Sequence, residues 1–434
     1  MHLHFSRNRV RRIVAVVASC NLLVLLCGYA ARQLRAMGTW QATELGSMIN
    51  ILSENNVAVW YSGMLFLATA LAMVGNFAVE KRSEHSHSRL ATSYGWLVCA
   101  AAFAFLSLDE MGSLHERVPS GFLPTIDGVE GWPAYLALPL LAMAAFFAAF
   151  TWRHLRHRPA TASLMALGVL LFLLVPVQEH VEVLLFWEAG TPTRPIWMEL
   201  LEEGTELFGG LSFLAAALVS ITETVAPNGG SRAVQVKLSV PLSLLVIVLL
   251  GAGMIASVTF LPTIMNTTDG SDGRGITANW FPSAASFISA LLLFGVSREQ
   301  RRAGMISVAQ ALGLLGVAHL VLSADHGAAH HFTEVFLEGN ATRRRQLDTL
   351  VIAGLLLASA WTLNAVRNPT FRVAVAAWTA LQLYAFLPGV EQRPVIAFAA
   401  YSLILLAIPG LAMAREAGAL ELAGVSPVGD DVTT

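Results

Sequence analysis

The stretch VAVWYSGMLFLATALAMVGNFAV, residues 57–79, contains no charged side chain. A helix of about 20 apolar residues crosses the hydrocarbon core of a bilayer, so this stretch predicts a transmembrane helix. Eleven further apolar windows follow one another along the chain. The twelve expected spans are Ile13–Leu34, Val57–Val79, Leu90–Leu108, Gly131–Trp152, Thr161–Glu182, Trp197–Ile221, Leu238–Leu261, Asn279–Val296, Ala303–Ala324, Leu347–Leu363, Phe371–Pro388 and Pro394–Ala414.

The composition of the whole chain favours the same class of protein. Hydrophobic residues make up 55% of the 434 residues and charged residues 13%, with a mean hydropathy of +0.62. Soluble domains average about 25% charged residues. The sequence therefore predicts an all-α integral membrane protein, and the twelve spans leave no room for a sizeable soluble domain.

The distribution of basic residues predicts the orientation of these spans. An even number of spans places both termini on one side, and most Arg residues and both lysines, Lys81 and Lys237, then fall on that side. Cytoplasmic loops of membrane proteins carry an excess of Lys and Arg, so we expect both termini to be cytoplasmic. Most of the acidic residues then fall at the periplasmic side of a multi-pass bacterial inner-membrane protein.

The second half of the chain repeats landmarks of the first half in the same order. Trp60, Asp109 and Pro176 correspond to Trp280, Asp325 and Pro388, and each proline is followed three residues later by a glutamate. We expect two six-helix repeats, residues 1–228 and 229–434, which are called the first and second half below. Because six helices is an even number, such repeats are parallel and related by an axis along the membrane normal.

The segment Ser107-Leu-Asp-Glu110, followed by His115-Glu116, resembles one found in an uncharacterised family of bacterial polytopic inner-membrane proteins. The resemblance covers the first six spans. It implies a bacterial inner-membrane location and implies no function.

Ionisable residues inside the expected spans gather near their periplasmic ends. The sixth span carries Glu199, Glu202, Glu203 and Glu206 on one face of a helix. Charged groups that face lipid are costly, so these carboxylates should face protein, water or a cation. Glu199 also suits the start of a helix, where the helix dipole favours anions.

Three further acids are candidates for the same site. Asp109 and Glu116 are seven residues apart and share a face at the end of the third span. Glu179 follows Pro176, whose ring frees a backbone carbonyl and kinks a helix, although such a kink also occurs for packing alone.

The end of the ninth span carries two histidines, His326 and His330, at positions where the third span has Glu110 and Leu114. His326 and His330 have the i, i+4 spacing that allows two rings to reach one metal ion. His319 lies on the same face, and for this residue we favour a core histidine that bonds a backbone carbonyl.

These residues predict a metal site with Asp109, Glu116, Glu179, Glu203, Glu206, His326 and His330 as candidate ligands and Glu179 and Glu203 as candidate catalytic groups. Mixed carboxylate and imidazole ligands suit zinc, iron or manganese. The first hypothesis is a metal-dependent hydrolase or oxidoreductase that takes a small molecule or lipid from the periplasmic side. The alternatives are a secondary transporter for protons or divalent cations, and a non-catalytic subunit that binds protein partners in a membrane complex. Nucleic acid is not an expected partner.

Overall fold

The computed structural model of the chain describes residues 2–38, 56–82, 87–112, 133–182, 184–185, 195–225, 232–235, 247, 250–251, 273–327, 341–385 and 393–422. Within these residues the fold is helical, apart from one pair of four-residue strands. The helices of the first half are α1 (Arg7–Ala36), α3 (Val57–Arg82), α4 (His87–Gly112), α6 (Pro133–Phe150), α7 (Pro159–Glu182) and α8 (Ile196–Val225). Those of the second half are α10 (Gly273–Arg302), α11 (Ile306–Gly327), α13 (Ala341–Ala365), α14 (Pro369–Ala385) and α15 (Arg393–Leu422).

Eight of the described helices are long and apolar enough to cross a membrane. They are α1, α3, α4, α6 with the π-helical turn η1 (Thr151–Leu155) that continues it, α7, α8, α10 and α11. Helices α13 and α15 contain shorter apolar segments, Ile352–Ala365 and Ile396–Pro409. These lengths and compositions are those of a polytopic membrane protein, and most of the expected seventh span, Leu238–Leu261, lies outside the described residues.

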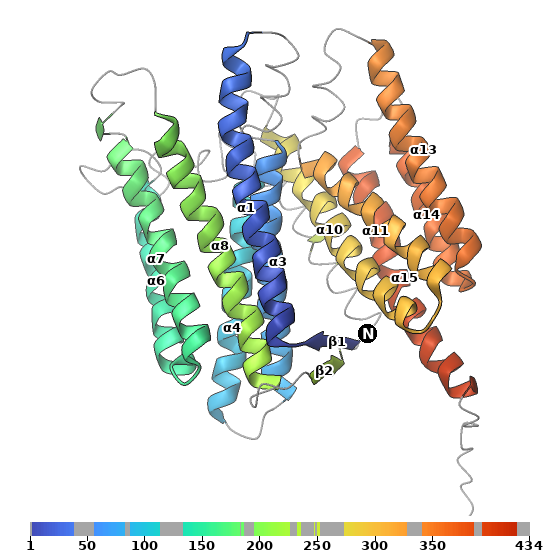
Figure 1. Cartoon of the computed structure of the whole chain (residues 1–434), viewed down its shortest axis with the longest axis horizontal. Helices are drawn as coiled ribbons and strands as arrows, with labels where there is room; N and C mark the ends of the chain where they lie inside the picture. Colours follow the sequence, from blue (N-terminus) through green and yellow to red (C-terminus); the bar gives the residue numbers. More distant parts are fainter. Residues whose placement is uncertain are drawn as a thin grey trace, which may run out of the picture.

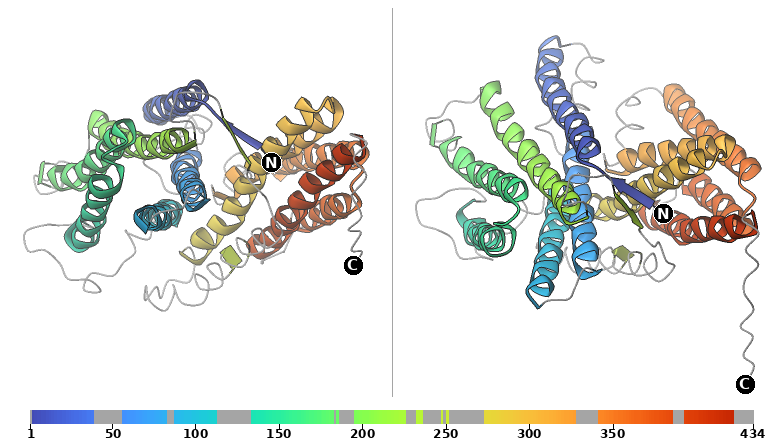
Figure 2. Two further views of the ribbon diagram at one scale, coloured as in Figure 1. Left: turned by 90° about the horizontal axis from the view of Figure 1, so that it is seen from below. Right: turned by 60° about the horizontal axis from the view of Figure 1, so that its bottom comes forward.

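The helices form two neighbouring groups, one from each half of the chain (Figures 1 and 2). In the first group α3 packs against α4 and α8, and α7 packs against α8. In the second group α10 packs against α11 and α15, and α14 packs against α15. Helices α3 and α4 meet α10 and α11 between the groups.

Below, the acidic end is the end of the molecule at which α4 and α7 end and α8 begins; it lies at the top of Figure 1. The opposite end holds the two short strands, β1 (His2–Phe5) and β2 (Arg232–Gln235), which pair antiparallel with His2 opposite Gln235. Because β2 lies in the connection between the halves, this pairing attaches the N-terminal segment to that connection.

Buried aromatic rings form much of the core of the first group. Phe103 on α4 lies 4.8 Å from Phe213 on α8, and Phe147 on α6 lies 5.1 Å from Phe213, measured between ring centroids. A Cβ atom at Gly168 of α7 would come within 2.6 Å of the Phe213 ring. Glycine at this position therefore allows α7 and α8 to approach closely, which matters because both helices carry acids of the candidate site.

A buried ion pair joins the same helices at the opposite end. Arg158, just before α7, donates to Glu80 of α3 at 2.5 Å and to Ser220 of α8 at 3.1 Å. Glu80 is 1% exposed and also accepts a hydrogen bond from Thr224 at 3.3 Å. A buried carboxylate is tolerated when it is paired and hydrogen-bonded in this way.

Two tryptophan indoles form hydrogen bonds across the interface between the groups. Trp60 on α3 donates to the Ser323 hydroxyl on α11 at 3.1 Å. Trp280 on α10 donates to the Ser107 hydroxyl on α4 at 3.0 Å. Each serine hydroxyl in turn donates to a backbone carbonyl within its own half, that of Gly63 for Ser107 and that of Ser283 for Ser323.

Candidate functional site: a carboxylate cluster at the acidic end

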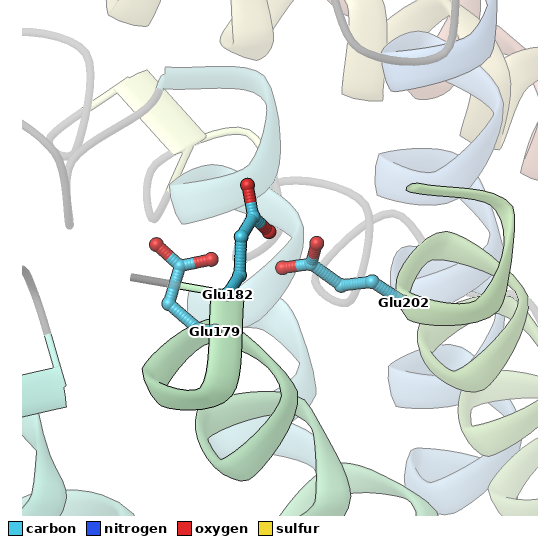
Figure 3. A group of neighbouring side chains, drawn as sticks. All are labelled: Glu179, Glu182 and Glu202. Atoms are coloured by element: carbon cyan, nitrogen blue, oxygen red, sulfur yellow. The ribbon is translucent and has the colours of Figure 1, made fainter. Parts of the chain in front are cut away.

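Three glutamates from two helices lie side by side at the acidic end. One carboxylate oxygen from each of Glu179, Glu182 and Glu202 lies within 4.8 Å of one from each of the others. Glu179 and Glu182 come from the last turn of α7, and Glu202 reaches toward them from α8 (Figure 3). Glu182 is 4% exposed, and the other two side chains are partly buried.

Local sequence places these three side chains on facing surfaces. Glu179 and Glu182 are three residues apart, so they project from the same face of α7. Gln178 of α7 donates to the Thr205 hydroxyl of α8 at 3.2 Å, one turn from Glu202. This contact holds the two helices together next to the three carboxylates, which are called the glutamate triad below.

Glu206, one turn further along α8, lies near Glu179 of the triad and three further acids. The carboxylates of Glu110, Glu203, Asp109 and Glu179 are close enough to interact electrostatically with that of Glu206. Glu110 also accepts a hydrogen bond from the Ser62 hydroxyl of α3 at 2.6 Å. The triad is therefore part of a larger group of carboxylates contributed by α4, α7 and α8.

Glu199 has a different environment from the other acids of α8. Its carboxylate forms a salt bridge of 3.2 Å with Arg32 near the end of α1. Asn21 of α1 donates to the backbone carbonyl of Leu207 at 2.9 Å. Helix α1 therefore forms polar contacts with α8 at two points along its length. Glu199 therefore serves to join α1 and α8.

The geometry of the glutamate triad suits a divalent cation. Oxygen ligands lie about 2.0–2.6 Å from Mg²⁺ or Ca²⁺, so two oxygens on opposite sides of one ion are about 4–5 Å apart. The three triad oxygens, each within 4.8 Å of the others, are therefore close enough together to reach one ion. Carboxylate oxygens are also ligands for manganese and, together with imidazole, for zinc and iron.

Two side-chain atoms on the same turn of α7 are buried and have no hydrogen-bond partner among the residues that the structure describes. They are Oε1 of Gln178 and Nδ1 of His180, the residues on either side of Glu179. Buried polar atoms are usually hydrogen-bonded. Adjacent helical residues project about 100° apart around the axis, so Gln178 and His180 flank Glu179 and are not part of the group of three glutamates.

The candidate residues from the sequence fall in three places. Asp109, Glu179, Glu203 and Glu206 lie together in the carboxylate group of the first half. His326 lies on α11 in the second half. Glu116 and His330 lie outside the described residues.

His326 belongs to a second buried polar cluster. Its Nε2 lies 3.0 Å from the Tyr401 hydroxyl of α15. His319, two turns earlier on α11, stacks on Trp378 of α14 at 4.7 Å between ring centroids and lies 5.4 Å from Tyr401. The Ser286 hydroxyl of α10 donates to the backbone carbonyl of His319 at 2.7 Å. Within the described part of the chain, Nε2 of His319 is buried and has no hydrogen-bond partner.

Sequence reasoning did not single out Glu110, Glu182 or Tyr401 as site residues. Glu182 could have been found from its i, i+3 spacing to Glu179 on the same span. Tyr401 stands in a run of apolar residues, and only the packing of α15 against α10 brings it to the polar cluster of the second half. Nothing in the local sequence indicates that contact.

The class of protein defined by these helices is a polytopic membrane protein with an acidic cluster at one end. Residues 14–221 match the family model of a domain of unknown function, DUF8692, which is consistent with an uncharacterised family. The match begins within α1 and ends within α8, so it includes all the carboxylates described above. Searches of curated proteins and of solved structures found no match.

Proposed function

We propose that this chain is a metal-dependent membrane enzyme whose ion binds at the glutamate triad. The observation that carries the proposal is the approach of three carboxylate oxygens from Glu179, Glu182 and Glu202 to within 4.8 Å of one another. Several carboxylates that converge in a low-dielectric site cannot all stay ionised without a nearby cation. A bound divalent ion supplies that charge.

The proposed roles follow from the position of each acid. Glu179, Glu182 and Glu202 hold the ion, and Glu203 on the next position of α8 accepts a proton from water. Glu206, Asp109 and Glu110 add negative charge that strengthens cation binding. When bound, the ion supplies a Lewis acid and a water of lowered pKa, which suits hydrolysis; a redox-active ion would suit an oxidoreductase.

The proposed topology brings this site to the periplasmic side of a bacterial inner membrane. Both termini and the β1–β2 pair are then cytoplasmic, and the acidic end is periplasmic. The support is the excess of Lys and Arg at the opposite end, where Lys81, Arg156 and Arg158 lie.

We also propose that the two halves are parallel repeats of six helices. The contacts of α3 with α4 and α8 have the same pattern as those of α10 with α11 and α15. The two cross-interface hydrogen bonds join Trp60 to Ser323 and Trp280 to Ser107, which are corresponding residues in the expected alignment. A pseudo-twofold relation between the halves would produce such a reciprocal pair.

Elemental analysis of the purified protein in detergent tests the enzyme proposal. We expect about one equivalent of zinc, iron or manganese that survives dialysis and is removed by a chelator. A protein that is folded and free of metal after purification in metal-supplemented buffer would overturn the proposal.

A secondary transporter is the second candidate, and the polar cluster of the second half favours it. Polar groups buried within a membrane protein mark proton or solute pathways, and His319, His326, Ser286 and Tyr401 form such a group. Uptake of a solute or of a divalent cation into vesicles that depends on a proton gradient would support this candidate. A tightly bound stoichiometric metal with no gradient-dependent uptake would support the enzyme.

A further inference from the structure

A series of hydroxyl and imidazole groups connects three helices of the second half. The Tyr401 hydroxyl of α15 lies 3.0 Å from Nε2 of His326 and also interacts with the Ser286 side chain of α10. The Ser286 hydroxyl lies 3.4 Å from Nδ1 of His319 on α11 and 2.7 Å from the backbone carbonyl of the same residue. Hydroxyl and imidazole groups both donate and accept hydrogen bonds, so each neighbouring pair in this series can pass a proton.

The series leads from the acidic end into the interior of the membrane. Helix α11 ends at the acidic end, because Ser323 near its end contacts Trp60 in the first turn of α3. His326 lies in the last turn of α11, and His319 lies seven residues earlier. At 1.5 Å per residue, His319 is about 10 Å deeper along the helix axis. Helix α11 is one of the candidate membrane spans, so a proton that moves along the series enters a region of low dielectric.

His319 has the surroundings of a residue that receives a proton. Its ring stacks on Trp378 of α14, with 4.7 Å between the ring centroids and 14° between the ring planes. The face of an indole ring attracts a cation, which offsets part of the cost of an imidazolium inside the membrane. Among the described residues, Nε2 of His319 is buried without a hydrogen-bond partner, so a proton that arrives at Nδ1 can leave from Nε2.

The other polar groups of the cluster favour water beside the series. Nε1 of Trp378 and Nε2 of Gln382, one turn apart on α14, are also buried without a partner in the described part of the chain. Buried polar groups are usually hydrogen-bonded, and buried water supplies missing partners. The ionisable groups of the cluster are Asp325, His326 and His319 on α11 and Tyr401 on α15, whereas α10 and α14 contribute the uncharged side chains of Ser286, Trp378 and Gln382.

We propose that the second half conducts protons from the acidic end to His319 in the membrane interior. The Tyr401 oxygen accepts a proton from the acidic end, and its own hydroxyl proton passes to the Ser286 oxygen. The Ser286 hydroxyl proton then passes to Nδ1 of His319, which carries protons on both nitrogens until Nε2 releases one. This inference goes beyond the proposed function, because no residue of the glutamate triad takes part and the protons move with or without the ion.

Currents measured on a solid-supported membrane after a rapid decrease in pH test the inference. The full-length protein is reconstituted into liposomes that are adsorbed to the sensor. A proton that moves part of the way across the membrane produces a transient current even when no solute follows it. We expect a transient in the wild type that is unchanged after removal of metal with a chelator. A wild type with no transient above that of protein-free liposomes would overturn the inference, whereas metal content alone decides the proposed function.

Single hydroxyl groups provide matched variants. S286A and Y401F each remove one hydroxyl from the series and should abolish most of the transient. S289A removes an equally buried hydroxyl of α10 that bonds the Ala285 carbonyl, and Y384F removes an exposed one from α14; both should keep the wild-type transient. The acids of the first half are present in all four variants, so they do not account for a difference.

Thermal unfolding separates a structural role from proton conduction. A folded S286A or Y401F variant with the transient of the wild type would show that the series is structural and that the inference is wrong. Either of the two variants decides this if the other does not fold.

Discussion

Trp60 of the first half donates a hydrogen bond to Ser323 of the second, and Trp280 of the second half donates one to Ser107 of the first, at 3.1 and 3.0 Å. Ser107 and Ser323 each stand two residues before an aspartate, Asp109 or Asp325. The serines that hold the halves together therefore lie within one turn of the acidic residues near the ends of α4 and α11. The interface and the carboxylate cluster therefore share helix α4.

The first prediction concerns the two indole hydrogen bonds. Trp60→Phe and Trp280→Phe each remove one donor and keep most of the apolar ring. We expect each to lower the free energy of unfolding by about 0.5–1.5 kcal/mol, the usual contribution of one hydrogen bond. Thermal unfolding in detergent measures this, with Trp152→Phe, a 70% exposed tryptophan, as control. Similar losses of unfolding free energy in the two variants would support equivalent hydrogen bonds across the interface. A loss in only one variant would contradict this equivalence.

The second prediction concerns the ion pair at the opposite end. Arg158→Met removes the cation beside Glu80, whose side chain is buried among α3, α7 and α8. Breaking a buried ion pair on one side costs about 3–5 kcal/mol, so we expect a large loss of folded protein. Arg156→Met, at an exposed position two residues earlier, should be close to neutral. The R158M, E80Q double variant should recover part of the lost folded protein, because no unpaired charge remains. If it recovers none, the unpaired charge of Glu80 is not the cause of the loss in R158M.

The third prediction concerns the His326–Tyr401 contact. Tyr401→Phe removes the hydroxyl that lies 3.0 Å from Nε2 of His326 and keeps the ring. We expect a loss of about 1–2 kcal/mol in unfolding free energy, with bound metal unchanged, because the proposed ion lies in the first half. Tyr384→Phe, on the exposed surface of α14, is the control. If Y401F loses metal and Y384F does not, the ion binds in the second half and not at the glutamate triad.

The fourth prediction concerns topology. In a variant with Cys20, Cys27 and Cys99 replaced by alanine, single cysteines are introduced at Asp127, Asp272 and His157. We expect an impermeant thiol reagent to label the first two from the periplasmic side and the third only after the inner membrane is permeabilised. Labelling of Asp127→Cys or Asp272→Cys only from the cytoplasm would place the acidic end on the cytoplasmic side.

The helices of the first half could be predicted from the sequence because each one contains a long apolar segment with few charged residues. The expected span Val57–Val79 and helix α3 differ only at the end, where the helix continues to Arg82. Charged residues continue a helix beyond the membrane at little cost, so hydropathy alone does not find its end. The strand pair β1–β2 was not predicted, because four residues such as HLHF carry no clear periodicity and pair only through tertiary contact.

The candidate site could be predicted only in part, because its arrangement also depends on tertiary contacts. Residue spacing placed Glu202, Glu203 and Glu206 on one face of a helix. It could not show that Glu202 approaches Glu179 and Glu182, or that Glu206 interacts with Asp109 and Glu110 of α4 as well as with Glu179 of α7. These contacts depend on how α8 packs against its neighbouring helices, and close approaches such as that of Gly168 to Phe213 contribute to that packing.

The fifth prediction separates the triad from the acids beside it. The E203Q, E206Q double variant keeps all three triad carboxylates. We expect weaker metal binding, by about 10–100-fold, because groups around a metal's ligands contribute that much to affinity. Titration with zinc or manganese followed by calorimetry measures the change. Unchanged affinity would show that these two acids do not act on the ion.

The metal content of the E182Q, E202Q variant tests the central claim most directly. Both substitutions keep side-chain volume and remove two of the three triad carboxylates, and Glu223→Gln, on the same helix α8 but at the opposite end, is the matched control. By elemental analysis we expect about one metal equivalent in the wild type and in E223Q, and less than a tenth of that in the folded double variant. Full metal content in E182Q, E202Q would contradict an ion at this cluster.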